Sequence, residues 1–444
     1  MTENQSIEYK KIWKDEYLKW ICGFANAQGG TLYIGKDDNE NVVGLKDTKK
    51  LLEDLPNKIT TILGIVCDVN LHTTEQGDYI EILVEPHPNP VNYKGEYHIR
   101  SGATKQELKG TALDSFLLKK QGKHWDSVAI PNVAIEDLSL IALQRFCNEA
   151  AKSGRVDDEV LNDNTAHLLQ DLQLIDEETN FLKRAAILLF HPKPEKFVTG
   201  AYIKIGFFDG DDDELAFQDE VNGSLMEQIE KTFDLLKSKY ITKAISYERV
   251  SRREKPAFPI NALRESLLNA VAHKDYSSGI PIQISVYSDR IVFWNPGHLP
   301  SSISIENLLQ KHPSIPYNPD IANTLFRSGD IEAWGRGYRK ILKSVLEHKL
   351  LPPIIQDFGG LMLTYYANIN SQLKYEKVDE RIIQIIEFVF THGSINNSEV
   401  QKLLSTSKPT ATRLLQQTEK WLKKKGERGQ GTNYILKWTE LIGS

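Results

Sequence analysis

The stretch that decides the fold is Pro259-Ile-Asn-Ala-Leu-Arg-Glu-Ser-Leu-Leu-Asn-Ala-Val-Ala-His-Lys-Asp-Tyr276. Its apolar residues recur at helical spacing, which predicts an amphipathic helix with one buried stripe. Glu265 and Asn269 are four residues apart, so both would project from the other face, with His273 one turn further on. A carboxylate in such a groove can orient a water molecule, and an amide oxygen can hold Mg²⁺. The alternative is an ordinary amphipathic helix with a solvated polar face.

Three segments further along the chain favour a nucleotide site. Residues 282–294 alternate apolar and polar side chains through a Ser288-Asp289 turn, which predicts a β-hairpin leading into Asn295-Pro296-Gly297. Gly335-Arg-Gly337 directly precedes an apolar helix, and unhindered backbone amides at a helix N-terminus can hold phosphate oxygens. A closing strand is expected at 358–365. A single Gly-x-Gly motif is weak evidence, but the ordered set is stronger.

This order resembles the GHKL ATP-binding fold of gyrase, histidine kinases and MutL, in the branch fused to Schlafen-like AlbA domains. The resemblance implies ATP and Mg²⁺ as cofactors, with Glu265 as the water-activating base and Asn269 as the Mg²⁺ ligand. The other predicted nucleotide-binding residues are His273 on the same helix, Asn295 and Gly297 on the adenine side, and Gly335 and Gly337 on the phosphate side.

The sequence departs from the family pattern on the adenine side. Asn295 stands where the family has an adenine-binding Asp, and Leu299 takes the place of the second Gly of that motif. An Asn accepts a hydrogen bond from the adenine amino group but carries no charge. We therefore expect nucleotide binding first and hydrolysis second.

Composition limits the class of protein. The chain has 444 residues, 40% of them hydrophobic, which suits about two to four domains with sizeable cores. It has no long apolar run and no signal-peptide core, so we expect a cytoplasmic protein without a membrane partner. Its three cysteines lie far apart, which argues against a disulfide framework or a zinc site. No P-loop motif occurs, which excludes P-loop ATPases.

Residues 1–125 are predicted to form a mixed α/β domain, with strands at 79–84 and 97–100 paired around a Pro-rich loop. The segments 7–10, 24–35 and 97–102 closely resemble the AlbA-type Schlafen core, also called divergent AAA-4. That resemblance implies a nucleic-acid-binding domain. The basic residues expected to contact nucleic acid here are Lys10, Arg100 and Lys105.

A nuclease site is the competing interpretation of this domain, since a related Schlafen core cleaves RNA with three acidic residues. Glu3, Glu8 and Asp37 can be laid onto that trio, and three converging carboxylates would bind a divalent metal and activate water. In the alternative, Glu8 pairs with a nearby Lys or Arg, and Asp37 belongs to a turn. The sequence leaves both open.

The remaining chain is predicted to form a helical connector at 126–180, used as a spacer, a GHKL-like ATP-binding domain at 181–375, and a winged helix-turn-helix at 376–444. Residues 401–437 contain nine Lys or Arg and two Glu, although the whole chain carries a formal net charge of −6. A third helix is expected at 409–425. The predicted nucleic-acid contacts of this module are Lys408, Arg413, Lys424 and Arg428. A winged helix used only for protein contacts is the alternative.

The modules together predict an α/β multidomain protein of transcriptional-regulator type that binds ATP and DNA or RNA. We expect a homo-oligomer whose oligomeric or nucleic-acid-bound state is switched by Mg-ATP. One rival is an ATP-controlled, Schlafen-like, metal-dependent endoribonuclease that acts in phage defence and uses the three N-terminal acids. Another is a scaffold with an inactive nucleotide site.

Overall fold

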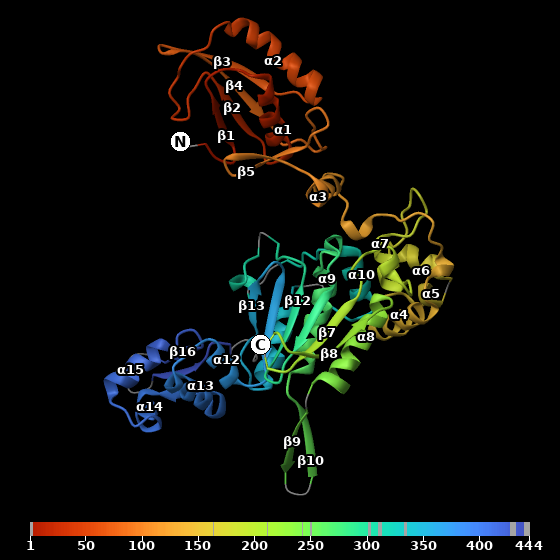
Figure 1. Ribbon diagram of the computed structural model, residues 1–444, viewed down its shortest axis with the longest axis vertical. Helices are drawn as coiled ribbons and strands as arrows, with labels where there is room; N and C mark the ends of the chain where they lie inside the picture. The colour runs from red at the N-terminus through yellow and green to blue at the C-terminus, as the bar shows by residue number, and fades with distance from the viewer. Residues whose placement is uncertain are drawn as a thin grey trace. The chain divides into compact units, whose positions relative to one another are not determined.

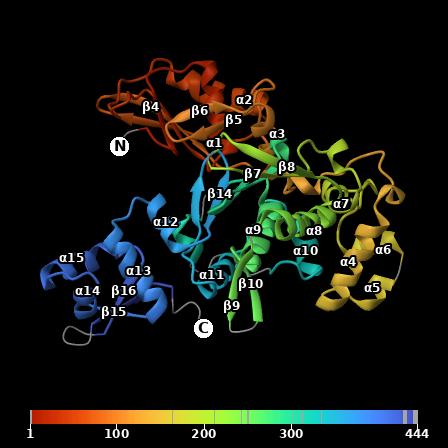
Figure 2. The same cartoon turned by 60° about the horizontal axis from the view of Figure 1, so that its bottom comes forward.

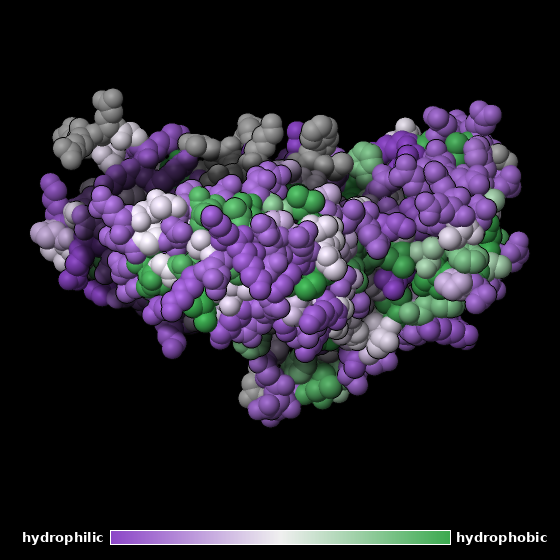
Figure 3. All heavy atoms as spheres, turned by 90° about the horizontal axis from the view of Figure 1, so that it is seen from above, coloured by the Kyte–Doolittle hydropathy of each residue, from purple (hydrophilic) through white to green (hydrophobic). Residues whose placement is uncertain are grey.

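The computed structural model describes residues 3–162, 164–210, 212–241, 243–248, 251–300, 303–309, 313–332, 335–426 and 432–438. The chain divides into two compact units, Met1–Trp125 and Asp126–Ser444 (Figure 1). Among the helices described, none is long and apolar enough to cross a membrane. On the face drawn in Figure 3, hydrophilic residues predominate and hydrophobic ones form scattered patches.

The first unit is built on a four-stranded sheet in the order β1-β2-β4-β3. Strands β1 and β2 are parallel, and the other pairs are antiparallel. Leu32, Ile34 and Ile80 alternate with polar or half-buried residues and pack with the helices in one apolar core. The elements are β1 (Ile7–Lys10), α1 (Leu18–Asn26), β2 (Gly30–Ile34), α2 (Thr48–Leu63), β3 (Asp68–Thr74), β4 (Gly77–Val84), β5 (His98–Ser101), β6 (Thr104–Glu107) and α3 (Gly110–Lys120).

The predicted pairing of residues 79–84 with 97–100 is wrong. Strand β4 pairs with β2 and β3, whereas β5 pairs with β6. Both hairpins close through two-residue turns, Glu75-Gln76 and Gly102-Ala103, and such short loops lose little entropy on closure. Strand β3 was not predicted from the sequence because five of its seven residues are polar.

The second unit contains a six-stranded sheet in the order β13-β14-β12-β11-β7-β8. Strand β11 runs parallel to β7 and antiparallel to β12, so the hairpin predicted at 282–294 is confirmed. Helices α8, α9 and α11 lie on one side of this sheet (Figure 2). The bounds are α7 (Arg184–Phe190), β7 (Ile203–Phe208), β8 (Leu215–Val221), α8 (Leu225–Leu235), α9 (Ile260–His273), β11 (Ile282–Val286), β12 (Arg290–Asn295), α10 (Pro319–Arg327), α11 (Gly337–Glu347), β13 (Ile354–Asp357) and β14 (Leu361–Tyr366).

The second unit also contains a helical region and a separate β-hairpin. A helical region comprises α4 (Leu140–Ser153), α5 (Asp158–Asn162) and α6 (Thr165–Asp171), and β9 (Lys243–Glu248) pairs with β10 (Ser251–Pro256) in a separate hairpin. Helix α4 begins at Leu140, because the Ser139 side chain accepts a hydrogen bond from the Ala142 amide and caps the helix there.

The described C-terminal residues form four helices and a three-stranded sheet in the order β15-β17-β16. The bounds are α12 (Ile369–Tyr375), α13 (Glu380–His392), β15 (Ile395–Asn396), α14 (Asn397–Leu403), α15 (Lys408–Gln417), β16 (Leu422–Lys425) and β17 (Asn433–Leu436). The helix predicted at 409–425 therefore ends at Gln417, and residues 422–425 of the predicted range form strand β16 instead. Trp421 and Leu422 pack into the same core as α13, which requires the chain to turn there.

Candidate functional site

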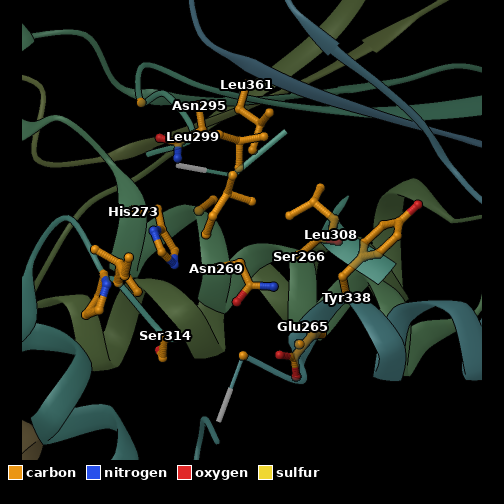
Figure 4. Close-up of a pocket in the computed structure, with 18 of the residues that line it drawn as sticks. Glu265, Ser266, Asn269, His273, Asn295, Leu299, Leu308, Ser314, Tyr338 and Leu361 are labelled. Atoms are coloured by element: carbon orange, nitrogen blue, oxygen red, sulfur yellow. The ribbon is translucent and has the colours of Figure 1, made fainter. Parts of the chain in front are cut away.

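Helix α9 forms one wall of a pocket in the second unit. Its apolar stripe is buried, with Leu263, Leu267 and Val271 fully inaccessible, as the helical spacing predicted. Glu265 and Asn269 project from the other face into a cavity of about 160 Å³. The cavity is also lined by α11, by the ends of β12 and β14, and by the segments that connect them. Figure 4 shows this helix with its polar side chains turned toward the cavity.

Gly337 is the point where α11 meets the polar pair of α9. A Cβ atom at this position would lie 2.6 Å from Glu265 Oε1 and 3.2 Å from Asn269 Oδ1. Two oxygen atoms of α9 therefore face the same small space beside the first residue of α11. Because any side chain would fill that space, glycine is the residue that keeps it open.

The N-terminus of α11 points into the same pocket. Arg336 is its N-cap and makes no side-chain capping bond, and Gly335 has a φ of +62°, which favours glycine. The Lys340 amide makes the 3.1 Å bond to the Arg336 carbonyl that begins the helical ladder. The amides before it have no acceptor within the helix, so they can bind an anion.

Burial dominates the electrostatics of Glu265, which is 7% exposed. Loss of hydration raises the pKa of this carboxyl, and the charge of Glu332 raises it further. Lys340 and Arg264 act in the opposite direction. The carboxyl therefore keeps its proton to a higher pH than an exposed Glu does, as a buried general base would.

Asn295 and Gly297 form the opposite wall. Asn295 is 5% exposed, and its Oδ1 is buried without a hydrogen-bond partner among the described residues. The Leu361 amide donates to the Gly297 carbonyl at 3.0 Å, and an added Cβ at Gly297 would overlap the carbonyl oxygen of His273. The loop is thus fixed between α9 and β14, and a ligand that donates a hydrogen bond could satisfy the Asn295 oxygen.

The predicted residues of this site therefore lie together. Glu265, Asn269, His273, Asn295, Gly297, Gly335 and Gly337 all line the one pocket. Sequence reasoning missed Ser266, Glu332, Tyr338 and the apolar wall that includes Leu308 and Leu361 (Figure 4). Tyr338 directly follows Gly337, so adjacency to the glycine motif was a signal that could have found it. Leu308 comes from a short 3-10 helix and Leu361 is the first residue of β14, and neither position carries a comparable pattern.

In the first unit the structure buries Arg100, which was expected to contact nucleic acid. Its Nη1 donates to Glu8 Oε2 at 2.7 Å, and its Nη2 donates to the carbonyl of Ile7 at 3.0 Å. The residue is 2% exposed, so it cannot reach a phosphate group, and that expectation is wrong. Lys10 also pairs with Glu8 and lies over the Trp20 ring, whereas Lys105 is half-buried on β6.

The three N-terminal acids do not converge. Glu8 is 1% exposed and belongs to the ion pairs with Arg100 and Lys10. Glu3 lies 3.5 Å from Lys10, and Asp37 accepts hydrogen bonds from the Asn39 and Asn41 amides in a turn. Across the described part of the chain, no three His, Cys, Asp or Glu side chains gather where they could hold a metal ion. The expected metal set of Glu3, Glu8 and Asp37 is absent there.

Removing Arg100 should destabilise the first unit strongly. Arg100→Ala leaves the buried Glu8 carboxylate with Lys10 as its remaining ion-pair partner, and breaking one such buried pair costs about 3–5 kcal/mol. We expect a loss of that size in chemical denaturation of the full chain. Lys14→Ala is the control, because its pair with Glu16 is exposed and should change stability by less than about 1 kcal/mol. Equal stability of the two variants would contradict the prediction.

The C-terminal module presents basic residues on two elements. Lys408 and Arg413 are exposed on α15, and Lys424 is exposed on β16. Arg428 lies outside the described residues. Asn397 Nδ2 donates to Thr412 Oγ1 at 2.9 Å, which ties the start of α14 to the exposed face of α15.

Comparisons with known protein families match two ranges of the chain, one in each of its two compact units. Residues 279–363 match the HATPase_c_4 family, described as "Putative ATP-dependent DNA helicase recG C-terminal". Residues 3–109 match the family described as "Schlafen, AlbA_2". The chain is thus a mixed α/β multidomain protein with an N-terminal Schlafen AlbA_2 domain and a RecG-related HATPase_c_4 domain, which confirms the resemblance stated from the motifs. Helix α9 lies outside the matched range.

Among solved structures, the chain is similar to the DIP2311 protein from Corynebacterium diphtheriae, with 18% identity, a TM-score of 0.48, and coverage of 99% of this chain and 94% of that chain. It is also similar to the N-terminal domain of a putative ATP-dependent DNA helicase RecG-related protein from Nitrosomonas europaea. That likeness has 23% identity and a TM-score of 0.18, and covers 23% of this chain and 83% of that chain. No curated protein matches the chain.

Proposed function

We propose that this protein binds ATP in the pocket between α9 and α11 and uses the nucleotide to control a nucleic-acid-binding state, as a regulator of transcription does. The observation that carries the proposal is the position of Gly337, which brings Glu265 and Asn269 against the free amides at the start of α11. A carboxylate, an amide oxygen and a helix N-terminus together suit a nucleotide phosphate group and its cation.

Each wall of the pocket has a part in this proposal. The loop of Gly335 and Gly337 holds phosphate oxygens through backbone amides, and Glu265 orients a water molecule for hydrolysis. The buried Oδ1 of Asn295 accepts a hydrogen bond from the adenine amino group. The apolar wall contacts the base and excludes water.

The residues fit Mg²⁺, which the ATP-binding resemblance implies. Asn269 Oδ1 and Glu265 Oε1 are hard oxygen donors that face the same space, and Mg²⁺ takes few protein ligands beside water and phosphate. When bound, the ion would neutralise phosphate charge. Asn269 would hold it, while Glu265 keeps its place beside the water.

Nucleic acid is assigned to two surfaces. The exposed Lys408, Arg413 and Lys424 give the C-terminal module a basic face on a helix followed by a hairpin, the element order of a winged helix. The Schlafen AlbA_2 domain supplies the second surface. We propose a homo-oligomer whose geometry responds to ATP, so that nucleotide binding changes how the basic surfaces meet DNA or RNA.

Calorimetric titration of the full chain with ATP, with and without Mg²⁺, tests the nucleotide site. Binding that tightens with Mg²⁺ and is lost in Asn269→Ala would support the proposal. Sedimentation velocity and duplex DNA binding are then measured with and without Mg-ATP. If ATP does not bind, the proposed nucleotide site is rejected and the pocket has another ligand. If ATP binds but changes neither the sedimentation coefficient nor the affinity for DNA, the proposed switch is rejected.

The raised pKa of Glu265 predicts how hydrolysis depends on pH. A general base acts when deprotonated, so the rate should rise with pH and its acid limb should lie above that of an ordinary Glu. Lys340→Met removes a cation that lowers this pKa, and should move the acid limb to higher pH. Lys343→Met, exposed on the same helix, serves as the control. An acid limb that Lys340→Met leaves in place, or no hydrolysis at all, would argue against Glu265 as the base.

A further inference from the structure

Residues 328–332 follow α10 and precede the phosphate-side glycines, Gly335 and Gly337, in the sequence. Ile331 and Glu332 of this segment line the pocket. Arg264, the neighbour of Glu265 on α9, anchors the segment from one side, because its Nη2 donates to Asp330 Oδ1 at 2.5 Å. Arg264 therefore ties residues 328–332 to the helix that carries Glu265.

A second anchor comes from the helical region that the sequence suggested was a spacer. Arg155, just after α4, donates from Nη1 to the carbonyls of Phe326 at 2.7 Å and Ile331 at 3.0 Å. Its guanidinium lies 4.3 Å from the centre of the Phe326 ring. Ser153 Oγ adds a 2.6 Å bond to the carbonyl of Arg327. One guanidinium thus fixes both ends of the turn from α10 to the pocket.

The same guanidinium shares a carboxylate with the pocket. Glu332 Oε1 lies 3.5 Å from Arg155 Nη2 and 3.6 Å from Lys340 Nζ. Lys340 is one turn after Gly337, so it stands on the pocket side of α11 close to Glu265. Arg155 and Lys340 share the Glu332 carboxylate. The charge of Lys340 is therefore neutralised less than it would be if Lys340 were the only partner of Glu332, and Lys340 can interact with another anion.

We propose that Arg155 is a positioning residue of the nucleotide site, which holds the Ile331–Glu332 segment so that Lys340 and the Gly-x-Gly loop present positive charge to the terminal phosphate of a nucleoside triphosphate. The inference rests on the proposed ATP binding and adds a residue outside the nucleotide-binding motifs. It makes the helical region part of the site, and it predicts selectivity for the triphosphate over the diphosphate.

The test measures the affinities of the full chain for Mg-ATP and Mg-ADP by calorimetry. In Arg155→Ala, Glu332 pairs with Lys340 alone, and the Ile331–Glu332 segment loses its hydrogen bonds to Arg155. The Kd for ATP should therefore rise about tenfold, while the Kd for ADP changes less than about twofold. Arg145→Ala is the matched control. Arg145 lies on α4, its side chain is 27% exposed like that of Arg155, and it pairs with Glu230 away from the segment. Its ATP-to-ADP ratio should equal that of the wild type.

Two further variants separate positioning from general stability. Arg155→Lys keeps the charge and the aliphatic stem but cannot bond both carbonyls and Glu332 at once, so it should lose part of the selectivity. In a Glu332→Gln background, Arg155→Ala should change ATP affinity less than it does in the wild type, because the part of its effect that passes through that carboxylate is already removed and only the loss of the carbonyl bonds remains. If the wild type prefers ATP and the Arg155 variants keep its ratio, or lose both nucleotides equally, the inference is overturned and ATP binding stands. A wild type that binds no nucleotide overturns both.

Discussion

Replacing Gly337 with alanine is expected to raise the Kd for Mg-ATP by about a hundredfold or more. The new Cβ would stand 2.6 Å from Glu265 Oε1, closer than a carbon atom tolerates, and 3.1 Å from Asn269 Nδ2, which is a tight contact. Either α11 must move away or the polar pair must turn aside. Both outcomes close the space in which the phosphate groups and Mg²⁺ would sit, and a hundredfold loss corresponds to about 2.7 kcal/mol.

Gly23→Ala is the matched control for this experiment. Gly23 lies in helix α1 of the other unit, and a Cβ there would meet its nearest neighbour, the Arg100 amide nitrogen, at an ordinary 3.5 Å. This variant should bind ATP like the wild type. Calorimetry measures the affinities, and thermal unfolding checks that both variants fold. A Gly337→Ala protein that folds and binds Mg-ATP within about threefold of the wild type would refute the placement of the phosphate groups.

Helix α9 could be predicted from the sequence because both of its faces carry a signal. Leu263, Leu267 and Val271 recur at helical spacing and are buried, and this periodicity fixes where Glu265 and Asn269 project. What periodicity cannot supply is the partner across the groove. The approach of Gly337 depends on how α11 packs on α9, a contact between residues about seventy positions apart in the chain.

Arg100 shows why a residue type alone misleads. Its sequence context of Lys and Tyr residues is equally compatible with a phosphate-binding face, and only the fold reveals that β1 places Glu8 beside it. The pair lies ninety-two residues apart, so no local pattern connects them. The same limit hid Arg155, whose partners Phe326 and Ile331 are more than 170 residues away.

The second large effect is expected in the C-terminal module, where Lys408→Ala combined with Arg413→Ala should weaken duplex DNA binding about a hundredfold. Both side chains are exposed on α15, and each charge-assisted hydrogen bond to DNA contributes roughly 1.5–3 kcal/mol. Because each lost phosphate contact also releases fewer counterions, the slope of log K against log salt should fall by about 0.9 per contact. Nucleotide affinity should not change.

The control for this double variant removes the same number of positive charges, but from residues outside α15. The double variant Lys374→Ala with Lys377→Ala also removes two positive charges. Lys374 lies in α12 and Lys377 lies two residues after the end of that helix, at one end of the same module. If α15 is the recognition helix, this control loses DNA affinity only through long-range electrostatics, by less than about fivefold at physiological salt, where charges beyond about 8 Å are screened. Equal losses in the two double variants would mean that DNA responds to total charge rather than to α15. Intact binding in both would leave the module as a protein-contact domain.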